Sequence, residues 1–426
     1  MSHNSITIIL PENVKLILRV LNENGYEAYV VGGCVRDSIL GNTPKDWDIC
    51  TSALPEIISL LFRQYELVLS GIKHGTVGVI IDNIVYEITT YRIDGNYTDS
   101  RHPDEIRFVN NIKQDLSRRD FTINAMAYNE SNGLIDPFLG LYDLKEKVIR
   151  CVGKPESRFG EDYLRVLRAV RFAVRYNFKI EPSTATEIKY FATKMRNVIS
   201  SERVIKEISE TLECSLIGQE SKISLLLYCF ECYYGVKLLS TEKAIGELIN
   251  SPVCLAIRIA VIISNSDYRS EDYDSNIIQN KLKLSKLVSK QIEHILQYSN
   301  NIGVQYFSRT ELIHNNENIP FCFLYLAYKI GKINASYVAE YLALHSHDSI
   351  RHQKLKNIAQ NLMKIDELGF VYKVAQLNIT GSDLISIGMN GTEIGVCLSN
   401  LLFKVMNNEI NNSKEELLQN ARASME

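Results

Sequence analysis

The spacing of apolar residues in the first 140 positions alternates between a helical and a strand-like period. Apolar residues recur at helical intervals between Pro11 and Asn24, namely Val14, Ile17, Leu18 and Leu21. We predict an amphipathic helix here, with Pro11 in its first turn and Gly25 at its end. Strand-like segments follow at Glu27–Val31, Asp46–Thr51, Thr76–Ile81 and Ile84–Tyr91, and the last two are predicted to form a hairpin that turns at Asp82-Asn83.

Beyond residue 140 the strand signals fade and helical periodicity dominates. The predicted helices are Glu161–Tyr176, Ser201–Leu216, Ser221–Cys232, Asn280–Tyr298, Pro320–His345, His352–Leu368 and Ile394–Asn407. The sequence therefore predicts an α+β protein, in which a small head with a mixed β-sheet precedes a long all-α part.

Composition narrows the class of protein without naming a function. The chain has 426 residues, a formal net charge of −3 and 46% hydrophobic residues, as an ordinary soluble globular protein does. No apolar stretch reaches the ~18 residues of a membrane span, and no secretory signal precedes the first helix, so we expect no membrane partner. The nine cysteines are scattered, which favours reduced thiols in a cytoplasmic protein. The near-neutral charge leaves room for nucleic acid bound by a local basic patch.

The first candidate site follows the strand that ends at Gly32-Gly33. A glycine pair before a short helix lets the backbone approach a ligand, and N–H groups at a helix N-terminus suit a polyphosphate. Gly33 and Arg36 are therefore candidate nucleotide-binding residues, since Arg36 can add a bidentate phosphate contact. A plain strand–turn–helix is the better explanation of the glycine pair when the pair is taken alone.

Asp46 and Asp48 are two residues apart on a predicted strand and would share one face of the sheet. Two carboxylates on one face repel each other unless a cation neutralises them, and Mg²⁺ is typically bound by one or two carboxylates plus substrate phosphates. Glu87, on the strand Ile84–Tyr91, is a candidate third metal carboxylate, and together the three could hold two ions for an in-line displacement at phosphorus. The alternative is a polar, solvated strand edge.

A second cluster of polar residues is the segment from Arg118 to Ala125, which reads RRDFTINA. Adjacent arginines beside an aspartate resemble an anchored phosphate clamp, and Arg119 is the candidate triphosphate ligand. Asn124 is placed to bond a ribose hydroxyl. Surface arginines at a helix N-terminus are the alternative.

A third cluster lies on the predicted helix Glu161–Tyr176. At ~100° per residue, Asp162, Arg165 and Arg168 fall on one polar face, and Arg171 lies further round. A carboxylate accepts hydrogen bonds and a guanidinium donates them, so Asp162 can take the exocyclic amine of cytosine or adenine while Arg165 serves the neighbouring ring nitrogen. Uracil and guanine would bring a carbonyl to the carboxylate, at a cost of roughly 1–3 kcal/mol. A solvated charged face is the alternative.

These three blocks, in this order and spacing, resemble the class II tRNA nucleotidyltransferases, which include bacterial CCA-adding enzymes and poly(A) polymerases. The similarity is strong over residues 20–210, includes the neck-like block Ile199–Val204, and is thinner around Gly381–Leu384 and Gly388–Gly395. The resemblance implies that Asp46 and Asp48 bind the catalytic metal. It also implies a set of nucleotide-binding residues, namely Gly33, Arg36, Arg119, Asn124, Asp162, Arg165, Arg168 and Arg171.

The resemblance also implies an organisation and a reaction. It suggests a nucleotidyltransferase head at residues 1–140, a base-recognising neck at 141–215, a helical body at 216–300 and a tRNA-binding tail at 301–426. The implied reaction is addition of CCA to the tRNA 3′ end from CTP and ATP, with Mg²⁺ as cofactor, while the tail grips the tRNA elbow. The oligomeric state is left open, a homodimer included.

Two segments favour CCA addition over other members of the family. Arg92–Pro103 resembles the flexible loop that CCA-adding and A-adding enzymes retain, and Ser70–Thr76 resembles the CCA-adding pattern rather than the Gly-Arg-Arg-type element of poly(A) polymerases. A-only addition and poly(A) synthesis remain alternatives within the family. A catalytically inactive RNA-binding protein is a remote one, because all three candidate carboxylates are present. A P-loop NTPase is not supported, since G-x-x-x-x-G-K-[ST] is missing near Gly32.

Two weaker signals are predicted to be structural. Cys229 and Cys232 form a single C-x-x-C pair without a second pair, which indicates two buried thiols rather than a zinc site. His345-Ser346-His347-Asp348 is similar to part of a metal-dependent phosphohydrolase site, but the further His and Asp ligands that such a site needs are not evident.

Overall fold

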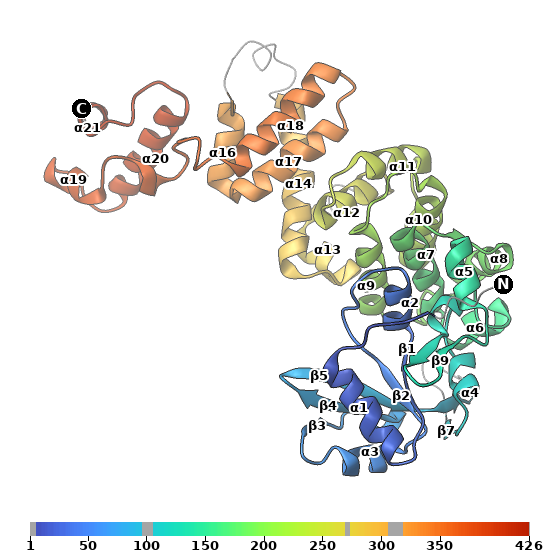
Figure 1. The fold of residues 1–426 in the computed structure, drawn as a ribbon. Helices are drawn as coiled ribbons and strands as arrows, with labels where there is room; N and C mark the ends of the chain where they lie inside the picture. Colours follow the sequence, from blue (N-terminus) through green and yellow to red (C-terminus); the bar gives the residue numbers. More distant parts are fainter. Residues whose placement is uncertain (1–5, 96–104, 269–272, 306–317, 426) are drawn as a thin grey trace. The chain divides into compact units, whose positions relative to one another are not determined.

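The computed structural model describes residues 6–95, 105–268, 273–305 and 318–425 (Figure 1). The chain divides into two compact units, Met1–Val236 and Lys237–Glu426, and each is described by itself. The segment resembling the flexible loop, Arg92–Pro103, lies outside the described residues from position 96 onward.

A mixed sheet forms the centre of the N-terminal unit. Within the described residues its seven strands run in the order β3-β4-β5-β2-β1-β8-β9. Their bounds are β1 Ala28–Val31, β2 Ile49–Thr51, β3 Glu66–Val68, β4 Thr76–Ile81, β5 Ile84–Thr90, β8 Ala127–Asn129 and β9 Gly133–Ile135. The pairing of β2 with β5 is parallel and the other neighbours are antiparallel.

The predicted hairpin is confirmed in its register. Strands β4 and β5 pair from Thr76 opposite Thr89 to Ile81 opposite Ile84. Asp82 and Asn83 between them have φ values of 52° and 61°, and a two-residue turn with two positive φ angles matches the twist of the flanking strands. Asn and Asp tolerate this backbone conformation better than other non-glycine residues do.

Two helices, α1 (Glu12–Glu23) and α3 (Pro55–Leu61), cover one face of the sheet. The predicted apolar stripe of α1 is buried, namely Val14, Ile17, Leu18 and Leu21. Pro11 is the N-cap residue, with an extended backbone, and not part of the first turn. Its lack of an N–H group costs nothing at this place, because the first N–H groups of a helix have no partner within it.

On the opposite face, described residues cover the sheet beside β1, β2 and β8. There Tyr29, Val31 and Cys50 pack against Ile112 and Leu116 of helix α4. The bounds of the elements at this side are α2 Gly33–Ile39, α4 Ile112–Ser117, η2 Thr122–Asn124, and the hairpin of β6 Arg92–Asp94 and β7 Ile106–Phe108. On the same face, β3 and β5 carry exposed side chains, namely Glu66, Val68, Val85 and Glu87.

Helices complete the N-terminal unit after the sheet. They are α5 Gly140–Glu146, α6 Pro155–Glu161, α7 Leu164–Tyr176, α8 Pro182–Ala192, α9 Ser201–Leu212 and α10 Glu220–Tyr234, with a small parallel pair of β10 Val148–Ile149 and β11 Lys179–Ile180. The single helix predicted from Glu161 to Tyr176 is wrong at its start. Asp162 has an extended backbone (φ −145°, ψ 108°) and separates α6 from α7.

The C-terminal unit is helical throughout its described part. Its helices are α11 Thr241–Asn250, α12 Leu255–Ser264, α13 Ser275–Leu282, α14 Lys286–Gln305, α16 Phe321–Ile330, α17 Lys332–Leu344, α18 Ser349–Met363, η4 Val374–Gln376, α19 Gly381–Ser386, α20 Thr392–Met406 and α21 Lys414–Ala423. The helix predicted from Pro320 to His345 is two helices, because Gly331 between them has φ +84°. The apolar faces of α16, α17, α18 and α20 share one core.

The fold class predicted from the sequence, a mixed-sheet head followed by helices, is confirmed. None of the described helices is both long enough and apolar enough to cross a lipid bilayer.

Candidate active site

The turn from β1 into α2 depends on a glycine. Gly32 has φ +79°, and a Cβ atom at this position would lie 2.8 Å from Nη1 of Arg119. Its N–H donates to the carbonyl of Met126 at 3.0 Å. The sequence signal of the glycine pair therefore has a steric cause, since the guanidinium of Arg119 occupies the space that a side chain would need.

Arg36 on α2 is buried and held by the protein itself. Its Nε and Nη2 donate to the two carboxylate oxygens of Asp37 at 2.9 and 3.0 Å, and its Nη1 donates to Oδ1 of Asn124. The guanidinium also lies 4.9 Å from the ring centre of Tyr176. This arrangement fixes α2 against η2 and α7, so the structure by itself supports a positioning role for Arg36.

Asp46 and Asp48 lie in the extended segment before β2, which begins at Ile49 and not at Asp46 as predicted. The ladder still reaches Asp48, whose carbonyl accepts the N–H of Val31 at 3.0 Å. Ile49 pairs with Ile88 in the parallel register of β2 and β5. The residues before them, Asp48 and Glu87, therefore occupy neighbouring positions on the opposite face of the sheet.

The carboxylates influence one another. Asp48 has an exposed surface, but protein atoms surround its carboxylate. This desolvation and the negative charges of Asp46 and Glu87 raise the pKa of Asp48 to about 6, and the positive charge of Arg119 opposes the increase. Repulsion of this kind favours a bound cation. Among the described residues, no three His, Cys, Asp or Glu side chains form a group that could hold a metal ion. The three-carboxylate metal site therefore stays a prediction.

Arg119 lies beside these carboxylates and is anchored from behind. Its Nη2 is 3.4 Å from Oδ2 of the fully buried Asp115, which also accepts Nη2 of Arg118 at 2.9 Å. Burial opposes the charge of Arg119, yet Asp115, Asp48 and Asp120 outweigh this and raise its pKa. Its buried Nε has no hydrogen-bond partner among the residues described, so this arginine keeps a donor that the protein does not use.

Asn124 and Arg168 meet at Asp120, a residue that the sequence motif contained but that was not among the candidates. Asp120 accepts Nδ2 of Asn124 at 3.0 Å and Nε of Arg168 at 2.9 Å. Burial works against ionisation of this carboxyl, but Arg168, Asn124 and Arg165 outweigh it and lower the pKa of Asp120 to about 2. Asp120 therefore joins η2 to helix α7.

Asp162 and Arg165 are not on one helical face as predicted, because Asp162 precedes α7. Its Oδ1 accepts the N–H of Leu164 at 3.0 Å, and its Oδ2 accepts Nη2 of Arg203 at 2.8 Å. Arg165 donates to Glu161 and, at 2.9 Å, to the carbonyl of Arg158. The acid and the arginine thus each have a partner that fixes their orientation, Arg203 and Glu161, and neither partner was a predicted site residue.

Arg171 is buried and is bound by α9. Its Nε donates to Glu207 at 2.5 Å and its Nη1 donates to Glu210 at 2.8 Å. Glu207 also lies 3.7 Å from Nη1 of Arg168. The sequence analysis missed Glu207, although a signal exists: it interrupts the apolar stripe of α9 that contains Val204, Ile208 and Leu212, and an acid on an apolar face needs a partner.

The structure shows what surrounds the residues of the two weaker signals. His345 contacts Glu247 at 3.4 Å, and Asp348 accepts the N–H of Ile350 at 2.8 Å as the N-cap of α18. Cys229 is buried and Cys232 is partly buried, and all nine cysteines are free thiols.

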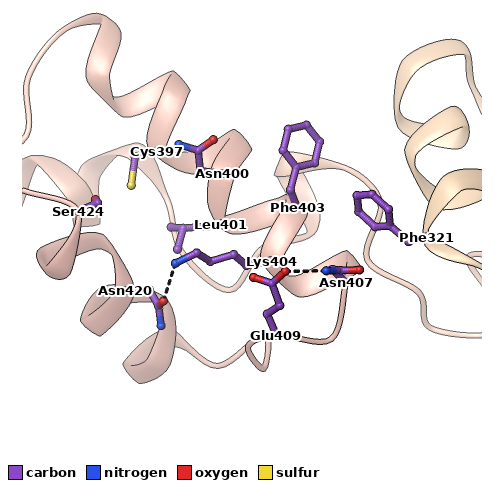
Figure 2. A pocket seen from close by; sticks show the side chains of 10 residues that line it. All are labelled: Phe321, Cys397, Asn400, Leu401, Phe403, Lys404, Asn407, Glu409, Asn420 and Ser424. Carbon is purple, nitrogen blue, oxygen red and sulfur yellow. Dashed lines mark hydrogen bonds between the residues drawn. The ribbon is translucent and has the colours of Figure 1, made fainter. Parts of the chain in front are cut away.

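A hollow of about 340 Å³ lies in the C-terminal unit between α16, α20 and α21. Figure 2 shows Lys404 extending to Asn420, whose Oδ1 accepts its Nζ at 3.0 Å. Its lining combines aromatic rings with amide and charged side chains, namely Phe321, Phe403, Asn400, Lys404, Asn407, Glu409 and Asn420, together with Cys397, Leu401 and Ser424.

Comparison with known proteins places this site in a family. The family described as "Poly A polymerase head domain" matches residues 28–150. A CCA-adding enzyme of Enterococcus faecalis is 33% identical over 410 residues, covering 95% of this chain and 94% of that protein. One of Levilactobacillus brevis is 47% identical over 206 residues, covering 48% and 51%.

Solved structures agree with these relatives. The Bacillus stearothermophilus CCA-adding enzyme in complex with CTP has a TM-score of 0.72 and 28% identity, and the match covers 98% of this chain and 99% of that one. The Thermotoga maritima enzyme complexed with tRNA shares the fold, with a TM-score of 0.70 at 22% identity over 98% and 97% of the two chains. The fold and these relatives together define a class II tRNA nucleotidyltransferase. The chain belongs to the CCA-adding enzymes within that class.

Proposed function

We propose that this protein adds the sequence CCA to the 3′ end of tRNA, using CTP and ATP. The 3′-hydroxyl of the tRNA attacks the α-phosphate of the nucleotide in line, and pyrophosphate leaves. The observation that carries the proposal is the grouping of Asp48, Glu87 and Arg119: two acids and a buried, anchored cation meet on one face of the sheet. Full-length similarity to CCA-adding enzymes supports the choice of substrate.

We assign the metal site to Asp46 and Asp48, with Glu87 beside them. Carboxylate oxygens are the ligands that Mg²⁺ prefers, and the raised pKa of Asp48 fits a position that a cation would relieve. When bound, Mg²⁺ would supply activation of the attacking hydroxyl and charge neutralisation at the α-phosphate and the leaving group. The family implies use of a divalent metal, and Mg²⁺ is our proposal for it.

The nucleotide is bound by arginines that the protein has oriented beforehand. Arg119 neutralises the triphosphate, close to the backbone of Gly33 at the start of α2. Arg36 acts from the buried side by holding Asn124, which faces the ribose. Because Asp37 and Asp115 fix these guanidinium groups before substrate arrives, binding does not have to order them.

Asp162 and Arg165 select the base. Arg203 and Glu161 hold their side chains from outside, which leaves the acid to accept an exocyclic amine and the arginine to donate to a ring nitrogen. Cytosine and adenine offer that pair of groups and uracil and guanine do not. Arg168 and Arg171 support this surface through Asp120 and Glu207.

We assign head, neck, body and tail to residues 1–140, 141–215, 216–300 and 301–426, and tRNA binding to the tail. The hollow beside Phe321 and Phe403 supports this assignment, since aromatic rings beside amide and lysine groups suit unstacked RNA bases. Free thiols and a tRNA substrate fit the cytoplasm.

The test is nucleotide incorporation on three labelled tRNAs, which end at the discriminator base, at C and at CC. Each is incubated with Mg²⁺ and CTP, ATP or both, and the products are resolved to single nucleotides. We expect the first tRNA to grow to CCA and stop. Growth of only the CC-ending tRNA would make the protein an A-adding enzyme, and continued adenylation would make it a poly(A) polymerase.

A further inference from the structure

The open face of β3, β4 and β5 adjoins the catalytic carboxylates and has no function in the site described so far. On β5, Val85 and Glu87 point to the same face, and Gly78 of β4 lies directly opposite Glu87. Val68 of β3 lies opposite Gly78 in turn. The side chains of Val85 and Val68 are 50% and 38% exposed.

The two valines form one patch because a glycine lies between them. A Cβ atom on Gly78 would be 3.0 Å from Cβ of Val68 and 3.1 Å from Cγ1 of Val85. The two side chains therefore close over the glycine and make a flat apolar surface. At about 4.8 Å per strand, the surface extends roughly 10 Å from β5 to β3, which is the scale of one nucleoside.

The geometry of an in-line displacement indicates which substrate group binds at this surface. Gly33 follows β1, Arg119 follows α4 and Asn124 ends η2. These residues lie on one side of β2 in the sheet order, and β5, β4 and β3 lie on the other side. In an in-line displacement the attacking oxygen approaches opposite the leaving group. A triphosphate bound on the β1 side thus requires the attacking 3′-hydroxyl to come from the β5 side.

The charge of the surface also fits a nucleoside rather than a phosphate. Val68, Gly78 and Val85 are uncharged. Glu87 adjoins Gly78 and Val85, and the exposed Glu66 lies beside Val68 on the same face, so a phosphate group would be repelled on this face. A sugar or base face can bury against the valine methyl groups and gains by doing so.

We propose that the Val68–Gly78–Val85 surface binds the 3′-terminal nucleoside of the acceptor tRNA and presents its 3′-hydroxyl to the carboxylates. This inference rests on the proposed function and deepens it, since it assigns the acceptor end to a surface that the nucleotide-binding residues do not use.

The hairpin offers a matched pair of variants for the test. Ile84 is 53% exposed and adjoins Val85, but it lies on the other face of β5. That face contacts α1, where Asn13 lies 3.5 Å from the Tyr86 hydroxyl. Val85→Asp and Ile84→Asp add the same charge at the same strand end, one on each face of the sheet.

The measurement is the single-turnover rate of CMP addition to a tRNA that ends at the discriminator base, with enzyme and CTP saturating. We expect Val85→Asp to lower this rate at least about tenfold and Ile84→Asp to change it less than about twofold. The CTP concentration for half-maximal rate should stay within about threefold in both. Val85→Thr keeps the shape of the side chain and should also lower the rate of CMP addition. If Val85→Asp melts at a lower temperature than Ile84→Asp, Val85→Thr takes its place in the test.

Equal rates for the two aspartate variants would overturn the proposal. So would a Val85→Asp variant with a raised half-saturation for CTP and a normal rate, because the surface would then serve the incoming nucleotide. Failure of the unsubstituted protein to add C to this tRNA would instead refute the proposed function itself.

Discussion

The two units of the chain bury different kinds of side chain. The N-terminal unit encloses charged residues that bind one another across elements, and Asp115, Arg171 and Glu207 are all less than 8% exposed. In the described part of the C-terminal unit, the shared core of α16, α17, α18 and α20 is apolar, with Phe323, Leu355 and Leu402 at its centre. The buried charged side chains in the described part of this unit are Arg258, Glu247 and Glu293, and they lie outside that core.

The difference reflects what each unit must position. A buried ion is costly unless a partner satisfies it, so each charged residue in the N-terminal unit fixes the identity of another. Asp37 is specified by Arg36, and Glu207 by Arg171. An apolar helix position accepts many side chains of similar volume. The first unit is therefore specific in its residues and the second mainly in its pattern.

The largest effect should come from a charge that is present for chemistry and not for stability. We expect Asp48→Ala to reduce nucleotide addition by at least about 10²–10³-fold while tRNA binding persists. Because the site disfavours the ionised Asp48, the thermal midpoint of the variant should equal or exceed that of the parent protein. Incorporation assays and thermal melting check the two parts, and normal turnover in the variant would refute the metal assignment.

Glu207 is expected to differ from Asp48, because its charge stabilises the fold of the N-terminal unit. Glu207→Ala leaves Arg171 buried without its Nε partner, and breaking a buried pair in this way costs about 3–5 kcal/mol. Denaturant unfolding of the N-terminal unit measures this loss of stability. Glu210→Ala is the matched control: it pairs with the same arginine, but its side chain is 39% exposed, so it should cost about 1 kcal/mol or less. Equal losses would contradict the distinction.

This contrast also explains how far the sequence could be interpreted. The hairpin turn at Asp82-Asn83 and the glycine at position 32 were predictable, because a positive φ angle restricts the residue type. The carboxylates and arginines proposed for the site were assigned from the family resemblance, and their spacing only made that assignment physically reasonable. The break at Asp162 was not, since a helical pattern continues through it and the Leu164 N–H and Arg203 that hold it are set by the fold.

A smaller effect should separate base selection from triphosphate binding. We expect Arg165→Ala to weaken discrimination of CTP against UTP by about 1–3 kcal/mol, roughly five- to 150-fold, while the half-saturation for CTP changes less. The ratio of kcat/KM values for the two nucleotides is the measurement. Arg175→Ala, on the exposed side of the same helix α7, is the control and should leave the ratio unchanged. A normal ratio in Arg165→Ala would refute the role of this arginine in base selection.

The smallest effect concerns a charged contact in the C-terminal unit that should respond to mild pH. Nε2 of His345 is 3.4 Å from Glu247, and its Nδ1 is 2.8 Å from the carbonyl of Tyr341. With an acceptor at each nitrogen, the doubly protonated ring fits best. Burial opposes this charge and Lys243 repels it, but the bonds to Glu247 and Tyr341 outweigh both and raise the pKa of His345.

A raised histidine pKa gives stability that is complete below the unfolded value of about 6.5 and is lost as pH rises through the folded value. We therefore expect the C-terminal unit to unfold more easily as pH rises above about 6.5, by less than about 1 kcal/mol in all. Denaturant unfolding at a series of pH values should show this slope in the parent protein and not in His345→Gln. If His345→Gln keeps the slope, another group is responsible for it. If neither protein shows the slope, Glu247 is held by Asn265, whose Nδ2 donates to Oε2 of Glu247 at 2.6 Å. His345 would then contribute packing alone.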